Sequence, residues 1–171
     1  MDKSIFKCIF KGLVRPHLEY AAPVWSPHHI KLKELLENVQ RRATKLVPGL
    51  ANLSYPDRLR QLNMPTLAYR RLRGDMIQTY KLLNGGYDGS LPNILQTSTT
   101  GLRGNKKKLY MKGPNKDIGL FSFTTRVCRL WNSLPDEIVT AENVKSFEIA
   151  LDRHWANQDL MYNDFKADIS I

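Results

Sequence analysis

Apolar residues recur at helical spacing along most of the chain and predict its main elements. The clearest pattern predicts a helix of several turns that Pro48 and Gly49 end. Its apolar stripe consists of Leu32, Leu35, Leu36, Val39, Ala43, Leu46 and Val47, and its opposite face carries Lys31, Asn38, Arg41, Arg42 and Lys45. A short amphipathic helix is predicted before it, with an apolar face formed by Ile5, Phe6, Ile9, Phe10, Leu13 and Val14.

Four further helical stretches are predicted downstream. Residues 54–57 resemble a capping box with proline in the first turn, which opens a short helix through Leu62. A long helix begins at Pro65 and Thr66, and its interior Gly74, which costs about 1 kcal/mol relative to alanine, indicates either close packing or a weak helix. Its buried stripe is Tyr69, Leu72, Met76, Tyr80 and Leu83, and the last helical stretches carry Val127, Leu130, Trp131, Leu134, Val144, Phe147, Leu151 and Trp155.

A polar, basic segment separates these helices. Residues 96–116 are rich in Ser, Thr, Gly, Asn and Lys and hold no acidic residue. Residues 109–111 and 119–123 flank a Gly-Pro turn, so a small β-hairpin is an alternative to a loop there. We therefore expect a mainly α protein with a helical region over 1–95, a basic loop or hairpin over 96–118, a helical region over 119–157 that packs on the first, and a frayed tail over 158–171.

The charge balance is the unusual feature of the composition. The 171 residues include 26 Lys and Arg against 16 Asp and Glu, a formal net charge of +10, while the hydrophobic fraction of 42% is ordinary for a soluble domain. Cys8 and Cys128 have no partner at metal or disulfide spacing, so we expect a reducing compartment and two small buried thiols. Lysines and an arginine interrupt the longest apolar stretch, and no secretory signal precedes it, which favours a cytoplasmic or nuclear protein without a membrane span.

No active site, cofactor site or metal site is predicted. The glycines near Arg103 lack the spacing and the flanking strand and helix of a phosphate-binding loop. His28 and His29 are adjacent, but no Cys, Asp or Glu lies near them at ligand spacing, so a solvated turn is the better interpretation. Nucleotidyl transfer needs clustered carboxylates, usually adjacent aspartates, and the chain has no such pair.

Basic clusters are the remaining candidates for function. Candidate contacts to nucleic-acid phosphates are Arg41, Arg42, Lys45, Arg70, Arg71, Arg73, Lys106, Lys107 and Lys108. The alternative is a solvated, salt-bridged helix face, because Arg41 follows Glu37 and Arg71 precedes Asp75 by four residues. Trp25, Trp131 and Trp155 lie in apolar contexts, so core packing is expected for them rather than base stacking.

Several ordered blocks carry a family resemblance. They are Leu13–Pro27 (LVRPHLEYAAPVWSP), Glu37–Thr44 (ENVQRRAT), Leu62–Leu67, Tyr69–Met76, Tyr80–Gly85, Phe121–Phe123 and Trp131–Asp136 (WNSLPD). In this order they resemble the region after the palm in reverse transcriptases of jockey-like non-LTR (LINE-type) retrotransposons. The resemblance covers roughly residues 4 to 156.

The resemblance implies a thumb-like helical bundle and a C-terminal tail without the polymerase palm. No catalytic residue of the family maps onto this chain, so its RNA-directed DNA polymerase activity is not expected here. A polymerase thumb grips the primer–template duplex, which agrees with non-specific contacts to an RNA or DNA backbone. The alternative is a helical interaction module that self-associates or binds a protein through apolar faces left by the missing palm, with Ile5 to Leu18 as the expected patch.

Overall fold

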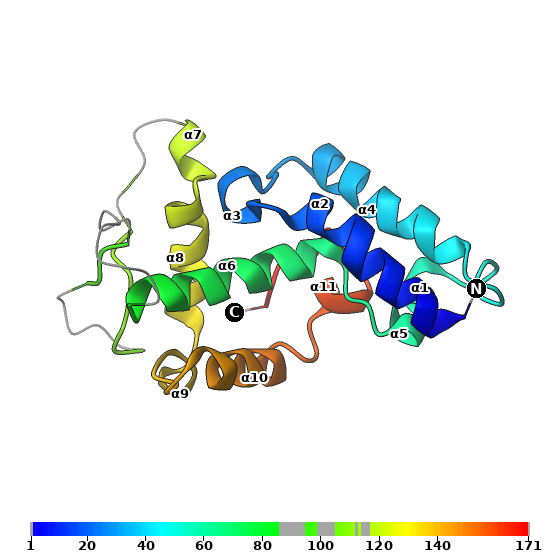
Figure 1. The fold of residues 1–171 in the computed structure, drawn as a ribbon. Helices are drawn as coiled ribbons and strands as arrows, with labels where there is room; N and C mark the ends of the chain where they lie inside the picture. The colour runs from blue at the N-terminus through cyan, green and yellow to red at the C-terminus, as the bar shows by residue number, and fades with distance from the viewer. Residues whose placement is uncertain (1, 86–94, 99–104, 112, 114–116, 171) are drawn as a thin grey trace. The chain divides into compact units, whose positions relative to one another are not determined.

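The chain is all-α over the part that a computed structural model describes, which comprises residues 2–85, 95–98, 105–111, 113 and 117–170 (Figure 1). The predicted helical class is confirmed. The helices are α1 (Lys3–Ile9), the π-helix η1 (Phe10–Val14), α2 (Arg15–Glu19), α3 (Ala22–Trp25), α4 (Ile30–Lys45), α5 (Tyr55–Leu62), α6 (Leu67–Leu83), α7 (Asp117–Leu120), α8 (Phe123–Ser133), α9 (Asp136–Val139), α10 (Val144–His154) and α11 (Asp159–Tyr162). None of the described helices is long and apolar enough to cross a bilayer.

The described residues divide into two compact units. The first comprises Met1–Leu72 and Asn157–Ser170, and the second comprises Arg73–Ala156. Helix α6 begins in the first unit and ends in the second. Each unit has a set of buried apolar side chains of its own.

The core of the first unit joins the N-terminal helices to α5. Its buried members are Phe6, Phe10, Val47, Leu50, Leu59, Leu62 and Met64. Of the apolar face predicted for the first helix, Phe6 and Phe10 are buried, whereas Ile5, Ile9 and Leu13 lie exposed. The helix widens into η1 just before Pro16, which has no N–H to donate and would crowd the carbonyl of residue 12 in a regular α-helix.

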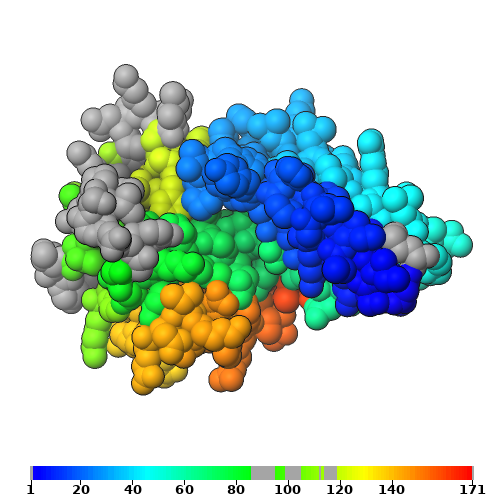
Figure 2. Space-filling view, viewed as in Figure 1, coloured from blue at the N-terminus to red at the C-terminus, as the bar shows by residue number. Residues whose placement is uncertain are grey.

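Helix α4 is present as predicted, but the face that it buries is different. Glu37, Gln40 and Thr44 are fully buried, whereas Leu35 is 64% exposed and Leu46 71% exposed. The remaining members of the stripe with exposed side chains are Leu32 and Val39, and Val47 alone of the stripe is fully buried. The apolar stripe of this helix therefore lies mostly at the surface. Figure 2 shows that α1 and α4, in blue and cyan, both present side chains at the surface of this unit.

A polar network explains why α4 turns this face inward. The Glu37 carboxylate accepts a hydrogen bond from the Leu67 backbone N–H at 3.0 Å and another from the Tyr55 hydroxyl at 2.5 Å. Gln40 donates to the Pro65 carbonyl at 3.0 Å. Because the first N–H groups of a helix have no partner within it, Glu37 satisfies the buried start of α6. Burial raises the pKa of Glu37, and its hydrogen bonds and the nearby Arg71 charge oppose that rise.

The C-terminal segment, which we expected to fray, is folded into the first unit. Leu160, Phe165 and Ile169 are buried. Thr66 donates its hydroxyl proton to the Leu160 carbonyl at 2.6 Å, and its N–H donates to the Met161 carbonyl at 2.9 Å. These bonds satisfy backbone groups of a segment whose apolar side chains are covered, so 158–170 forms part of the unit.

The second unit packs the end of α6 against α8 and α10. The ring of Phe147 lies 4.6 Å from that of Tyr80 and 5.8 Å from that of Trp131, centroid to centroid. Trp131 and Trp155 are buried, as predicted. The Asn143 side chain accepts from the Ser146 N–H at 2.9 Å and caps the start of α10.

No β-hairpin forms within the described residues, so that alternative is wrong. Its second arm, 119–123, belongs to α7 and the start of α8. Leu109 instead makes one isolated antiparallel bridge with Thr97. Most of the expected turn lies outside the described residues, as do Arg103, Lys112 and Lys116 of the basic stretch.

Candidate nucleic-acid interface

Positive charge is concentrated in the N-terminal part of the chain. The first 72 residues contain 13 Lys and Arg against five Asp and Glu. Several of these cations lie on α4, whose last turns carry Arg41, Arg42 and Lys45. A polyanion would meet a net positive field on this unit.

Arg42 and Lys45 are exposed on α4 and make no ion pair with any residue that the structure describes. Helical spacing places Arg42 between Val39 and Leu46 on the face that α4 turns to solvent. The buried Glu37, Gln40 and Thr44 fix this orientation, because rotating α4 would break their hydrogen bonds. The inward polar face therefore positions the outward cations.

Arg41 is held at the edge of the same face by two aromatic rings. Its guanidinium carbon lies 5.0 Å from the centroid of Tyr55 and 5.6 Å from that of Phe165, which are cation–π distances. Its Nη1 donates to the Asn38 side-chain oxygen at 3.0 Å. No carboxylate within the described part of the chain pairs with it.

The second predicted cluster, Arg70, Arg71 and Arg73, is engaged by carboxylates. Arg70 forms a two-pronged ion pair with Glu19. Arg71 is buried, and its charge acts on Glu37. These partners compete with any phosphate for the guanidinium groups.

Arg73 lies in the second unit and is also engaged. Its Nε is 2.6 Å from one carboxylate oxygen of Asp152, and its Nη2 is 3.7 Å from Glu148. Asp75, expected to pair with Arg71, binds Arg126 at 2.8 Å. This helix region supports the alternative of a salt-bridged face more than that of a phosphate site.

The backbone of the lysine run, Lys106–Lys108, and of the next residue is hydrogen-bonded to side chains at the end of α8. Trp131 donates its indole N–H to the Lys107 carbonyl at 2.8 Å. Asn132 donates to the Leu109 carbonyl at 3.0 Å and accepts from the Leu109 N–H at 2.8 Å, as a neighbouring strand would. The WNSLPD block, for which the sequence indicated no role, thus holds residues 106–109.

The three lysine side chains differ in how accessible they are to an anionic ligand. Lys106 is exposed, with its Nζ 3.6 Å from Asp136. Lys107 is half-buried and donates to the Asn84 side-chain oxygen at 2.6 Å. Lys108 is also half-buried.

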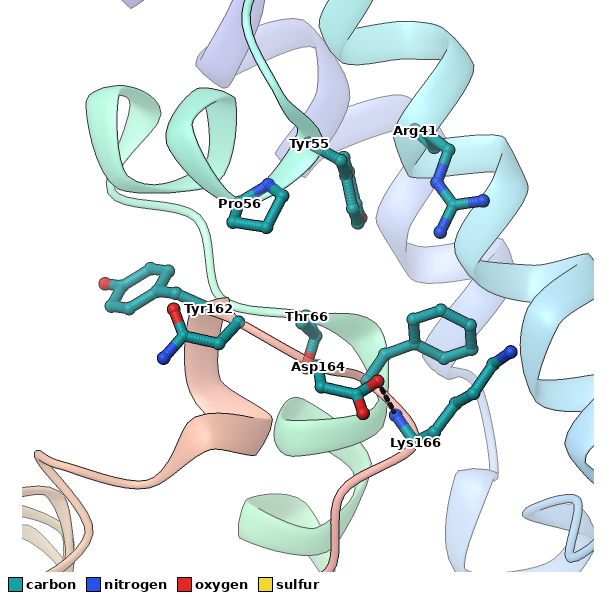
Figure 3. Close-up of a pocket in the computed structure, with 9 residues that line it drawn as sticks. Arg41, Tyr55, Pro56, Thr66, Tyr162, Asp164 and Lys166 are labelled. Atoms are coloured by element: carbon teal, nitrogen blue, oxygen red, sulfur yellow. Dashed lines mark hydrogen bonds between the residues drawn. The ribbon is translucent and has the colours of Figure 1, made fainter.

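A pocket in the first unit is lined in part by residues that no sequence pattern indicated. It has a volume of about 330 Å³ and lies between α4, α5 and the C-terminal segment (Figure 3). Its walls include Arg41, Tyr55, Phe165, Asp164 and Lys166. In the sequence, only the aromatic and basic residues of the C-terminal segment could have indicated this pocket. They were not considered, because that segment was expected to be frayed.

The remaining candidate residues lie elsewhere. Trp25 and Cys8 are exposed, so their predicted burial is wrong, whereas Cys128 is buried and burial raises the pKa of its thiol. The rings of His28 and His29 lie 3.9 Å apart and exposed. Within the described ranges, no three His, Cys, Asp or Glu side chains come together as metal ligands.

Three comparisons with known proteins find no relative. No protein-family model matches the chain, and searches of curated proteins and of solved structures likewise give no match.

Proposed function

We propose that this chain is the non-catalytic, C-terminal thumb and tail portion of a jockey-like non-LTR retrotransposon reverse transcriptase, and that it binds RNA or DNA backbones without sequence preference. Two findings support this proposal. The ordered sequence blocks resemble that region of the family. The described residues are all-α, as a thumb-like bundle requires.

The observation that carries the binding proposal is the pair of exposed cations on α4. Arg42 and Lys45 have no ion-pair partner among the described residues, so a phosphate would not have to displace a carboxylate. Arg41 adds a third charge beside them. Phosphate contacts by Lys and Arg give affinity by releasing counterions and carry no sequence information.

Charge reversal on α4 tests this proposal. We expect Arg42→Glu with Lys45→Glu to weaken binding to a mixed-sequence duplex strongly at low salt, measured by fluorescence anisotropy. The matched control is Arg129→Glu with Arg153→Glu, two exposed arginines of the second unit that change the net charge equally. Equal weakening in both double variants would show that net charge alone matters and would contradict an α4 interface.

A second candidate function is self-association, which the exposed apolar residues of the first unit favour. Leu35 and Val39 on α4, Leu46 at its C-cap, and Ile5 and Ile9 on α1 are exposed. Exposed apolar side chains in such number favour contact with another apolar surface. A second copy of the chain would supply the same surface, as in an isologous dimer.

Sedimentation velocity across a range of protein concentrations tests self-association. We expect a dimer that Leu35→Ser with Val39→Ser dissociates. Ile149→Ser, at a residue 50% exposed in the second unit, is the control that should leave the dimer intact. A wild-type chain that stays monomeric throughout would rule out this candidate.

A further inference from the structure

Arg15 on α2 is a buried cation whose hydrogen-bond donors are unused. The residue is 8% exposed, and its guanidinium makes no hydrogen bond with any residue that the structure describes. Its Nε is fully buried without a partner, whereas its two Nη groups are not fully buried. A guanidinium carries five N–H donors, and burying such groups unsatisfied is costly. Arg15 therefore has strong donors to offer to an anion that reaches its Nη groups.

Arg58, in the same unit, shows how the protein satisfies a buried arginine elsewhere. It is 3% exposed, and its Nε donates to the Thr44 hydroxyl at 3.1 Å. Its Nη1 donates to the Leu53 carbonyl at 2.6 Å, and its Nη2 to the Arg41 carbonyl at 3.5 Å. All three nitrogens of that guanidinium thus have acceptors within the chain. Arg15 has none among the described residues, which points to an acceptor from outside the chain.

The carboxylate that pairs with Arg15 is hydrogen-bonded to a different arginine. Oε1 of Glu19 lies 3.8 Å from the Arg15 Nε, which is beyond hydrogen-bond distance. Both oxygens of Glu19 accept from Arg70, which extends from the start of α6 to α2 (Figure 1). Two guanidinium groups thus share one carboxylate, which leaves an excess of one positive charge. Burial lowers the pKa of Arg15, the Arg70 charge lowers it further, and Glu19 opposes both effects.

We propose that Arg15 and Arg70 bind a phosphate group that has three free oxygens, either a free phosphate or the terminal phosphate of an RNA or DNA strand. The oxygens would accept from the two Nη groups of Arg15 and from Nη1 of Arg70, which makes no hydrogen bond with the described residues. Nε is the Arg15 atom nearest to Glu19, so a phosphate at the Nη groups lies farther from that carboxylate. The planar guanidinium matches the spacing of phosphate oxygens.

This site is separate from the α4 interface of the proposed function, because it uses neither Arg42 nor Lys45. A phosphodiester inside a strand has two free oxygens, whereas a terminal or free phosphate has three, one for each donor group of the site. Arg15 also directly follows the π-helix η1, and π-helical turns often occur at functional sites. The site therefore predicts that a terminal phosphate strengthens the binding of a strand.

Arg15→Met tests the site, because it removes the guanidinium and keeps a long apolar side chain. Glu19 keeps Arg70 as its partner, so no buried charge is left unpaired. When inorganic phosphate replaces chloride at equal ionic strength, the thermal unfolding midpoint should rise in the wild type and stay constant in Arg15→Met. Arg129→Met, at an exposed arginine of the second unit, changes the net charge equally and should keep the wild-type rise.

Arg15→Lys is a second variant that keeps the buried charge and lacks the planar fork. Its phosphate-dependent rise should be smaller than that of the wild type. Circular dichroism verifies that each variant is folded. An equal rise in the wild type and in the folded Arg15 variants, or no rise in the wild type, overturns the inference.

Fluorescence anisotropy distinguishes the two sources of the phosphate. A single strand of about ten nucleotides carries either a 5′-phosphate or a 5′-hydroxyl, and we expect about tenfold tighter binding of the phosphorylated strand, a difference that Arg15→Met abolishes. A phosphate-dependent midpoint without this difference assigns the site to free phosphate. Duplex binding that survives charge reversal on α4, with the phosphate effect intact, contradicts the α4 interface alone. Duplex binding that this reversal abolishes, without a phosphate effect, contradicts the Arg15 site alone.

Discussion

At the scale of single residues, the buried carboxylate of Glu37 does most to orient the candidate interface. It joins α4 to Tyr55 and to the first turn of α6. A buried charge is costly unless hydrogen bonds compensate it. Removing this group should therefore loosen the orientation of Arg41, Arg42 and Lys45 as well as the fold.

The pKa of Glu37 gives a testable dependence of stability on pH. Burial raises this pKa above its ordinary value of 4.5, so the folded chain binds the proton more tightly than the unfolded chain. Through this group, stability is greatest below about pH 4.5 and is lost as the pH rises through the folded-state pKa. Glu37→Gln cannot titrate, so the wild-type free energy of unfolding relative to the variant should fall from about pH 4.5 toward neutrality.

Urea unfolding of both proteins across this pH range measures the difference directly. Other titrating groups are common to the two proteins and cancel in the comparison. Parallel stability curves for wild type and Glu37→Gln would show that the carboxylate is not perturbed by burial.

At the scale of elements, Gly74 weakens α6 without an evident packing reason. It is exposed, and apart from its chain neighbours and the backbone of its own helix no atom lies within 4 Å of where a Cβ would be. Of the two explanations that the sequence allows, a weak helix is therefore the one supported. Gly74→Ala should raise the free energy of unfolding by about 0.5–1 kcal/mol, measured by thermal or urea unfolding.

The same substitution at Gly85 is a control, because it should change the free energy of unfolding in the opposite direction. Its φ of +72° lies in the left-handed region, which alanine adopts at a cost. Gly85→Ala should therefore destabilise the fold. If both alanine variants shift stability in the same direction, the helical interpretation of Gly74 is incorrect.

The hydrogen bonds between Asn132 and the backbone of Leu109 predict that losing them exposes residues 106–108 to protease. Asn132→Ala removes both hydrogen bonds to Leu109 and leaves two part-buried backbone groups unsatisfied, at a cost of about 1 kcal/mol. Limited trypsin digestion should then cleave faster after Lys106, Lys107 and Lys108. Asn143→Ala, which removes the cap of α10, should cost about 1 kcal/mol without selective cleavage there. Equal cleavage patterns would contradict this prediction.

The positions of the main helices could be predicted from the sequence, but the face that each buries could not in every case. Leucine periodicity located α4, yet its buried face is set by Glu37 and Gln40, whose partners lie 15 to 30 residues away. The pocket was missed for the same reason, because Tyr55 and Phe165 are distant in sequence and meet only through folding. A local signal, the cap at Ser54, was predicted correctly since its partner Asp57 is three residues away.

At the scale of the whole molecule, the net charge of +10 is the excess of 26 Lys and Arg over 16 Asp and Glu, and several of these cations are engaged in internal ion pairs. Arg70, Arg73 and Arg126 each bind a carboxylate. Arg41, Arg42 and Lys45 do not, within the described residues. The candidate interface is therefore a small part of the total charge, on one face of α4.

The salt dependence of duplex binding tests this account most directly. Each bond to a phosphate that a substitution removes makes the slope of log affinity against log salt shallower by about one. We predict a steep slope for the wild-type chain and a slope shallower by about two for Arg42→Ala with Lys45→Ala. An affinity independent of salt, or the same slope in the wild type and this variant, would contradict the account.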